Sequence, residues 1–253
     1  MSHPDAANYV LALDLPEAPP ELEAVEAAPV DFGSDEVAAV VGAQLAEFSK
    51  GVPAALRSAV ADCLLLAQLA ANKANSGNPD LMAWYRKYVE VLQGTGWLVE
   101  NMSFEARDVG DMNAGVHKAI IPVLTAMLGP AVAAVSVVIS VLQGLQEMDK
   151  DNPWITLFDR ASQHASGAKL QFGFVAMDPA DPAAVQVKLL AVAVDAKRTL
   201  TQVLFFKFSD QKASLKTGDT QLSMATSRLE SIHQAVADRV QPFLADNISK
   251  VEL

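Results

Sequence analysis

The clearest hydrophobic pattern lies in three apolar runs in the second half of the chain, residues 168–177, 185–194 and 200–208. In the first two runs both alternating sets of positions are apolar at the centre, which is typical of strands buried on both faces. Residues 178–182 and 195–198 separate the runs, and these lengths suit antiparallel hairpin loops. The pattern therefore predicts an antiparallel sheet that is covered on both faces.

Helical patterns precede these strands. Ser34, with two acidic residues after it, predicts the start of a helix over residues 34–50. Pro53 suits the first position of a second helix, over 53–73, so the two would form a helical hairpin. Apolar residues at helical spacing predict a third helix over 80–93.

Weaker patterns complete the expected elements. Residues 9–15 and 97–107 alternate enough to predict strands, and residues 213–222 predict a further strand at the sheet edge. A last amphipathic helix is expected near the C-terminus, because apolar residues recur there at spacings of three and four. These residues are Leu229, Ile232, Val236, Val240 and Phe243.

The longest charge-free stretch, residues 119–145, is 27 residues long and by length alone could span a membrane. Gly129-Pro130 divides it, so we predict two helices, 112–128 and 130–148. The second is apolar on nearly every side, which leaves two interpretations open: deep burial in the fold, or contact with lipid in another state. The candidate residues of this helix pair are Ile120, Ile121, Leu124, Val137, Val138 and Ile139.

Composition and charge narrow the function classes. The 253-residue chain is 51% hydrophobic and 19% charged, which excludes a disordered protein, and its net charge of −11 argues against a nucleic-acid partner. Ten of the 30 acidic residues and none of the 19 basic ones lie in residues 1–49, so the remainder is close to neutral. We interpret residues 1–33 as an acidic leader, either a removable pro-segment or a solubilising tail, and 34–253 as one domain.

The sequence offers no recognisable catalytic or ligand-binding motif. The His-Glu-x-x-His, Gly-x-Ser-x-Gly and P-loop patterns are absent, and Ser209–Lys212 matches Ser-x-x-Lys only by chance. His3, His117, His164 and His233 are scattered, and we interpret them as surface or core-edge residues. We expect no enzyme, no cofactor and no metal site.

The single cysteine and the N-terminus bear on the cellular location. Cys63 lies in an apolar helical run, so it forms no intramolecular disulfide and is expected to pack in the core. No basic region followed by an apolar stretch is visible at the N-terminus, so we expect no secretory signal. The expected protein is soluble as synthesised, is released by an unconventional route and then associates with a membrane.

The order of segments in the second half carries a resemblance to a known family. The charge-free helix pair is followed by Asn152-Pro153-Trp154-Ile155, then by 170–175 and 185–194, and then by 202–210, which read Gln-Val-Leu-Phe-Phe-Lys-Phe-Ser-Asp. Over about residues 95–240 this order resembles the Cyt family of cytolytic δ-endotoxins. Fungal volvatoxin and the Erwinia virulence factor are similar in architecture. The branch of the virulence factor has an acylated cysteine in its second half. This chain differs, because its single cysteine, Cys63, lies in the first half.

The resemblance implies a fold and an activity. The implied fold is α/β (α+β), a single-domain three-layer sandwich in which helical hairpins wrap a central antiparallel sheet. The implied activity is that of a pore-forming toxin or virulence factor, whose helical layers are displaced so that its strands meet lipid. Family protoxins lose terminal segments to proteases, and residues 1–33 occupy such a position. The alternative is a non-lytic protein of the same fold that binds lipid or another apolar ligand.

Candidate membrane-insertion residues are the apolar positions of the three long runs. Backbone groups in lipid must be paired, so insertion would require the strands of several copies to associate on the membrane. The expected partners are therefore a lipid membrane and further copies of this chain. The candidates are Leu170, Phe172, Phe174, Val187, Leu189, Leu190, Val203, Leu204, Phe205, Phe206 and Phe208.

Overall fold

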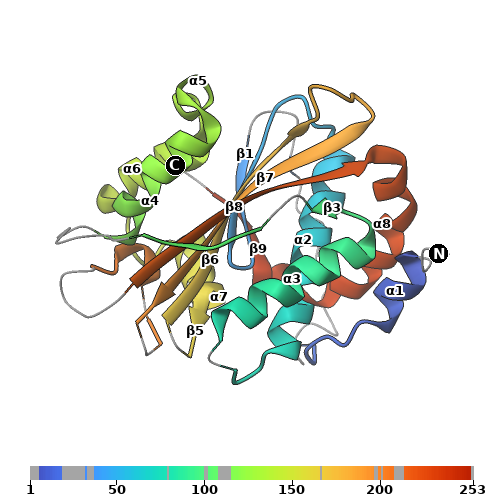
Figure 1. Cartoon of the computed structure of the whole chain (residues 1–253), viewed down its shortest axis with the longest axis horizontal. Helices are drawn as coiled ribbons and strands as arrows, with labels where there is room; N and C mark the ends of the chain where they lie inside the picture. The colour runs from blue at the N-terminus through green and yellow to red at the C-terminus, as the bar shows by residue number, and fades with distance from the viewer. Residues whose placement is uncertain are drawn as a thin grey trace.

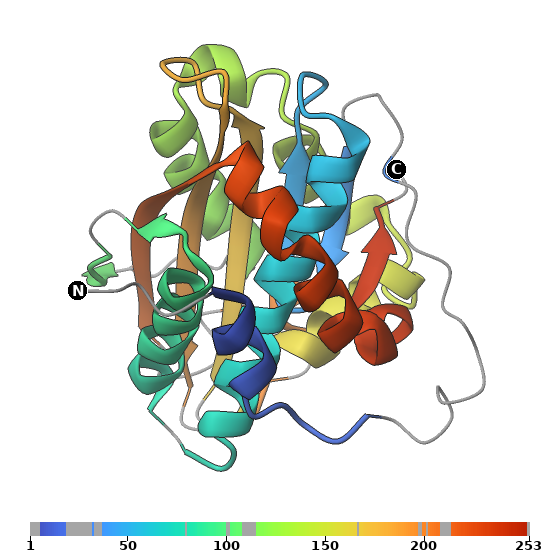
Figure 2. The ribbon, with the colours of Figure 1, turned by 90° about the vertical axis from the view of Figure 1, so that its right-hand side faces the viewer.

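A central sheet with helices on both faces forms the protein, as Figures 1 and 2 show. Several positions used above lie outside the residues that the structure describes, among them His3, the expected helix start at Ser34, the first residues of the helix predicted over 112–128, Phe208 and Ser209–Lys212. The computed structural model describes residues 6–18, 32, 37–78, 80–99, 102–107, 115–165, 167–196, 199–200, 202–207 and 214–251.

One sheet joins both halves of the chain. Its strands are β1 (Val37–Val41), β2 (Gln44–Phe48), β3 (Leu98–Val99), β4 (Glu105–Arg107), β5 (Gln163–His164), β6 (Gly167–Met177), β7 (Ala184–Asp195), β8 (Ser214–Ala225) and β9 (Ile248–Lys250). In the described part of the chain these nine strands follow the order β3-β8-β7-β6-β2-β1-β9, with β4 beside β8 and β5 beside β6. All pairs are antiparallel except β2 and β6, which are parallel.

The long strands β6, β7 and β8 form the centre of this sheet. Strands β6 and β7 confirm the first two predicted runs, and Gly173 pairs with Leu189 across them. Strand β8 is longer than the predicted run at 213–222, and it lies inside the sheet, with Leu189 opposite Thr220. Strand β7 is paired along almost its whole length on both sides, and helices cover both faces of this meander, so apolar residues on both faces can be buried.

One face of the sheet is covered by helices from both ends of the chain (Figure 2). They are α1 (Ala6–Ala12), α2 (Ala54–Ala74), α3 (Leu81–Thr95) and α8 (Thr226–Val240). Helices α2, α3 and α8 confirm predicted helices, and Asp80 caps α3 by accepting a 2.9 Å hydrogen bond from the Met82 amide. The apolar side of α3 is buried. The ring of Trp84 stacks on that of Tyr88, with 5.5 Å between the ring centres.

The opposite face carries the second helical layer (Figure 1). This layer consists of α4 (Val116–Leu128), α5 (Pro130–Ala133), α6 (Val137–Gly144), the 3-10 helix η2 (Leu145–Glu147), α7 (Pro153–Ser162) and the 3-10 helix η3 (Val203–Phe205). The short helices η5 (Gln241–Phe243) and α9 (Leu244–Asn247) lead from α8 to β9. The expected α+β class, with a mostly antiparallel sheet between two helical layers, is confirmed.

The expected helix over 34–50 is wrong, because its described part forms the β1–β2 hairpin. Strand β2 lies between β1 and β6 and is buried on both faces, and such an apolar strand lacks the alternation that separates it from a buried helix. Gly42 has a φ of 56° in the turn, and the Gln68 amide holds the turn from α2. The Ala43 amide donates to Gln68 Oε1 at 2.7 Å, and Gln68 Nε2 donates to the Val41 carbonyl at 2.8 Å. Helix α2 therefore packs against α3 and not against the helix predicted over 34–50.

Two expectations in the helical layers also need correction. Residues 9–15 do not form a strand, because Ala6 and Val10, four positions apart, turn α1 toward the core. The helix predicted over 130–148 is broken after Ala133. The Ser136 side chain caps α6 by accepting a 3.2 Å hydrogen bond from the Ile139 amide, so a new helix starts there.

The third apolar run, 200–208, is not a strand in its described part. Gln202 has a φ of 53°, in the left-handed region that ends a strand, and η3 follows it. The carboxylate of Asp159 accepts a hydrogen bond from the Val203 amide, a contact that composition does not indicate. The strand predicted over 97–107 is reduced to β3 and β4, which both pair with β8.

Candidate functional site

The apolar face of β6 and β7 beneath α4–α7 is the centre of the candidate site. Leu170 and Phe172 of β6 are fully buried there, and Phe174 is 8% exposed. Leu190 of β7 joins the same hydrophobic cluster, because alternate residues of a strand share one face. The structure thus brings four of the predicted insertion residues together.

The two remaining β7 candidates face the other way. Val187 and Leu189 are buried in the cluster beneath α2, α3 and α8. Insertion through both faces of β7 would therefore require both helical layers to move. Sequence alternation gives the two sets of positions but not which helices cover each set.

The helix-pair candidates cover the first face. Ile120 and Leu124 of α4 and Val138 and Ile139 of α6 are buried in the same cluster as Phe172. The two other candidates are partly buried at the border of this cluster, and they are Ile121 and Val137.

Helix η3 and the residue after it, Phe206, pack against the same cluster. Val203 and Leu204 are buried, while Phe205 and Phe206 are partly buried against the same cluster. The Val116 amide, at the start of α4, donates a 2.9 Å hydrogen bond to the Phe206 carbonyl. These four η3 candidates therefore lie beside the helix pair although they form no strand.

His117 ties α4 to this segment. Its Nδ1 lies 2.7 Å from the Leu204 carbonyl, so Nδ1 carries the proton and donates. Burial lowers the pKa of His117, the hydrogen bond to Leu204 opposes this shift, and the nearby Lys118 charge adds to it. The histidine is 2% exposed and is held neutral, as a core residue.

A buried carboxylate anchors α6 to the sheet. Glu47 of β2 is 5% exposed, and its Oε2 accepts hydrogen bonds from the Ser136 hydroxyl at 2.7 Å and the Val138 amide at 2.9 Å. A negative charge at a helix N-terminus is favourable. The sequence patterns did not predict this contact. An acidic residue inside the apolar stretch 37–48 is the feature that could have indicated it.

The helical cover matches only the apolar part of the sheet face. Gln186 and Lys188 share the face of Leu190 and are partly exposed, and Asp219, which pairs with Leu190, is exposed. Polar residues thus occupy the part of the face that faces solvent. Displacement of α4–α6 would uncover the apolar part.

The outer end of this layer exposes apolar side chains. Val132 of α5 is 49% exposed and Val135, before α6, is 67% exposed. Both lie within the charge-free stretch 119–145. Deep burial therefore holds for Val138 and Ile139 but not for this tip, which we define as residues 131–135.

The opposite helical layer contains a buried lysine. Lys169 of β6 is 5% exposed, and its Nζ donates to the Gln163 carbonyl at 3.3 Å and the Ala161 carbonyl at 3.4 Å. The ammonium lies 5.2 Å from the centre of the Trp84 ring. Burial lowers the pKa of Lys169 to about 8.

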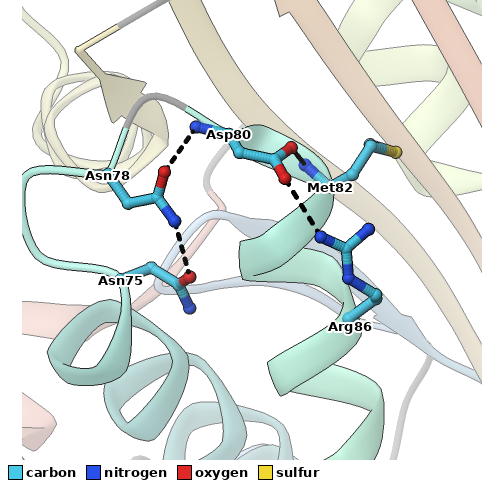
Figure 3. A network of polar contacts seen from close by, with 5 residues as sticks. All are labelled: Asn75, Asn78, Asp80, Met82 and Arg86. Atoms are coloured by element: carbon cyan, nitrogen blue, oxygen red, sulfur yellow. Dashed lines mark hydrogen bonds and ion pairs between the residues drawn. The ribbon is translucent and has the colours of Figure 1, made fainter.

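A polar network closes the turn between α2 and α3 (Figure 3). Asn78 accepts from the Asp80 amide at 3.0 Å, and Asp80 pairs with Arg86 at 3.0 Å. Beside it lies a pocket of about 370 Å³ between α3 and residues 102–104. Its lining includes Met82, Tyr85, Val89, Met102 and Phe104, with Arg86 as the charged residue.

The described residues include a helix of membrane-spanning length but no cluster of metal ligands. In that part of the chain no three His, Cys, Asp or Glu side chains gather as metal ligands. Among the described helices, α2 has the length and composition of a membrane span, but 83% of its most apolar 18-residue window is buried, so it serves as a core helix. Cys63 on α2 is buried as expected, and burial raises the pKa of its thiol to about 12.

Comparison with known proteins finds similarity among solved structures. No protein-family model and no curated protein sequence matches this chain. Among solved structures, a delta-endotoxin is similar over 63% of this chain and 74% of its own, with 17% sequence identity and a TM-score of 0.34. With this TM-score the likeness carries no argument about the fold or the activity of this chain.

Proposed function

We propose that this protein is membrane-active in the manner of a cytolysin. The tip at residues 131–135 contacts a bilayer first, and helices α4–α6 then leave the sheet face and associate with lipid. One observation carries the proposal: a helical layer without charged residues over 119–145 covers an apolar sheet face and exposes Val132 and Val135.

The charge pattern supports contact with a neutral surface. The tip can enter the bilayer interface without burying a charge, because the nearest charged residue before it is Lys118 and the nearest after it is Glu147. Each of the two valines gains about 1 kcal/mol when its exposed part is buried. The net charge of −11 opposes binding to anionic lipid, so the favoured target is a zwitterionic membrane.

The helices are attached in a way that permits their displacement. Glu47 holds the start of α6, and the Leu204 and Phe206 carbonyls hold His117 and the Val116 amide of α4, while apolar contacts account for the packing between these anchors. Lipid can replace apolar contacts at little cost, whereas these polar anchors must be broken. We propose that these anchors set the barrier to displacement.

Lipid-exposed strands require partners. Once α4–α6 leave, Leu170, Phe172 and Leu190 would meet lipid, and the backbone groups of every inserted strand must remain paired. We therefore propose that several copies associate on the membrane. We propose that the protein acts without a cofactor and without enzymatic turnover. A substrate screen that detects turnover would contradict this part of the proposal.

The acidic leader is proposed as a removable segment. Its described residues pack on the layer of α2, α3 and α8, with the Arg239 side chain donating to the Leu13 carbonyl. Removal of the leader would first loosen the layer of α2, α3 and α8, which lies opposite α4–α6. We propose that it limits movement of that layer, beneath which Val187 and Leu189 lie.

Vesicle leakage tests the proposal. The full chain, intact or after mild proteolysis in residues 19–31, is added to phosphatidylcholine vesicles that contain a dye, and flotation measures binding. We expect the cleaved wild-type protein to bind and to release the dye, the intact protein to release less of it, and Val132→Asp/Val135→Asp to lose both. Leu98→Asp is the control, because Leu98 is 63% exposed on β3, away from the tip. Absence of binding and release in both forms of the wild-type protein would contradict the proposal.

The pocket beside α3 favours a second candidate function, the binding of a lipid or other apolar ligand without lysis. Its apolar lining includes the flexible residues Met82 and Met102, which adapt to different shapes. Native mass spectrometry of the purified full chain tests this function. A co-purifying apolar ligand that is lost in Val89→Trp supports it, and a ligand-free protein that takes up no added fatty acid contradicts it.

A further inference from the structure

A second pocket, of about 400 Å³, lies between α2 and α8. Ala55 and Ala237 form parts of its two helical walls, and Leu244 and Ile248 contribute from the C-terminal segment. Phe32 closes one side, and its position is fixed by its ring contact with Phe48 at 4.9 Å. The volume and the apolar walls are those of a site for a small organic molecule.

A buried carboxylate lines this pocket. Asp62 of α2 is 8% exposed, and its Oδ2 lies 3.1 Å from His233 Nε2 on α8. Burial raises the pKa of Asp62, and the hydrogen bond and charge of His233 oppose this shift. Asp238 is the second carboxylate of the lining, and its Oδ1 accepts a 2.7 Å hydrogen bond from Gln234.

Among the described residues, the lining contains two carboxylates and one histidine but no lysine or arginine. An anionic ligand would be repelled by Asp62 and Asp238. A metal ion would find too few ligands, since no metal-binding group of three occurs among the described residues. A cation with an apolar body satisfies both features of the pocket: its charge compensates the buried carboxylate, and its body fills the apolar walls.

We propose that this pocket binds a small organic amine, whose ammonium group donates a hydrogen bond to Asp62 and whose apolar body lies between Ala55, Ala237 and Leu244. His233 contacts Oδ2 of Asp62 from α8, and the ammonium group would donate to the other oxygen of this carboxylate. The pocket lies in the layer opposite α4–α6, so amine binding uses none of the residues that are proposed to contact the bilayer.

Isothermal titration calorimetry on the full chain, at neutral pH, tests the proposal with three probes of one size. Hexylamine is protonated, 1-hexanol is neutral and hexanoate is anionic. We expect hexylamine to bind at a single site at least tenfold more tightly than 1-hexanol, and hexanoate to bind more weakly than either. Equal affinities of hexylamine and 1-hexanol would overturn the proposal, and that result requires no variant.

Variants place the ligand in this pocket. Asp62→Asn should weaken hexylamine binding at least tenfold and leave 1-hexanol binding within twofold, because the shape is kept and the charge is lost. Ala237→Phe should abolish binding of both probes by filling the space. Asp219→Asn removes the same charge at an exposed position of β8 and should change neither affinity. Unchanged hexylamine binding in folded Ala237→Phe, or in folded Asp62→Asn, would overturn the assignment.

Discussion

The carboxylate of Glu47 accepts a 2.7 Å hydrogen bond from the hydroxyl of Ser136, a residue 89 positions later in the chain. The same carboxylate accepts from the Val138 amide, so one buried side chain of the central sheet binds the first turn of α6. Because neighbouring contacts of α6 are largely apolar, this contact fixes where the helix sits on the sheet.

Removal of this anchor should loosen α6. In Glu47→Ala the Val138 amide and the Ser136 hydroxyl lose a partner in the core, and we expect the free energy of unfolding to fall by about 2–4 kcal/mol. Glu47→Gln keeps an acceptor oxygen and should cost about 1 kcal/mol. Hydrogen exchange of the α6 amides and denaturant unfolding measure both effects. Glu105→Ala, at an exposed position, is the control. Wild-type exchange in α6 of Glu47→Ala would contradict this role.

Acid should weaken the attachment of α4 through His117. The pKa of His117 in the folded protein is lowered from 6.5, so the unfolded chain binds the proton more readily. This contribution to stability is complete above pH 6.5 and is lost as the pH falls below that value. We expect thermal unfolding at pH 7.5 and pH 5.5 to differ less in His117→Asn, whose amide can donate to the Leu204 carbonyl. An equal difference in the variant and the wild type would show that other groups cause the acid sensitivity.

Stability should also change in alkaline solution, through Lys169. The pKa of Lys169 is lowered from 10.5 to about 8 by burial, so the unfolded chain binds one proton more than the folded protein between these values. Stability should rise as the pH increases from about 8 to 10.5, by at most about 3 kcal/mol. Below pH 8 the full cost of the buried charge is present.

Lys169→Met tests this effect. The variant keeps most of the apolar stem but removes the ammonium, and its stability should exceed that of the wild type at pH 7 by about 1–3 kcal/mol. The difference should shrink as the pH rises to 10.5. Urea unfolding across this range measures it, with the partly exposed Lys188→Met as the control. A difference that is constant with pH would contradict a buried charged lysine.

Local patterns predicted some of these elements and failed for others for physical reasons. Helix α8 followed from its periodicity, and strand β6 followed from its length as an apolar run that ends at turn residues. Strand β2 was predicted as helix, because a strand buried between two neighbours shows no alternation. The Glu47 and Asp159 contacts that hold α6 and η3 join residues far apart in sequence, so no local pattern indicates their partners.

The candidate site shows the same division. Phe172 and Leu124 were singled out as apolar, and the structure places them in one cluster. Their covering helices, and the opposite orientation of Leu189, depend on which layer packs on which face. The exposure of Val135 depends on the break before α6, which Ser136 imposes through its cap.

The position of the leader can be changed by a single methyl group. Gly94 of α3 lies beneath the Tyr9 ring of α1, and a Cβ atom at Gly94 would lie 2.2 Å from two ring atoms. Gly94→Ala should therefore displace Tyr9 and with it α1, while the helical backbone of α3 accepts alanine readily. We expect faster proteolysis within residues 6–18 and little change in the stability of the remaining fold.

Limited proteolysis with mass spectrometry of the fragments measures this release. Gly144→Ala is the matched control, because a Cβ atom there meets no other atom within 4 Å. If the leader restrains membrane activity, Gly94→Ala should release dye from vesicles without added protease, and Gly144→Ala should behave as the wild type does. Protection of residues 6–18 in Gly94→Ala at the wild-type level would mean that α1 tolerates the added methyl group. Cleavage of the leader without dye release would separate its docking from any control of membrane activity.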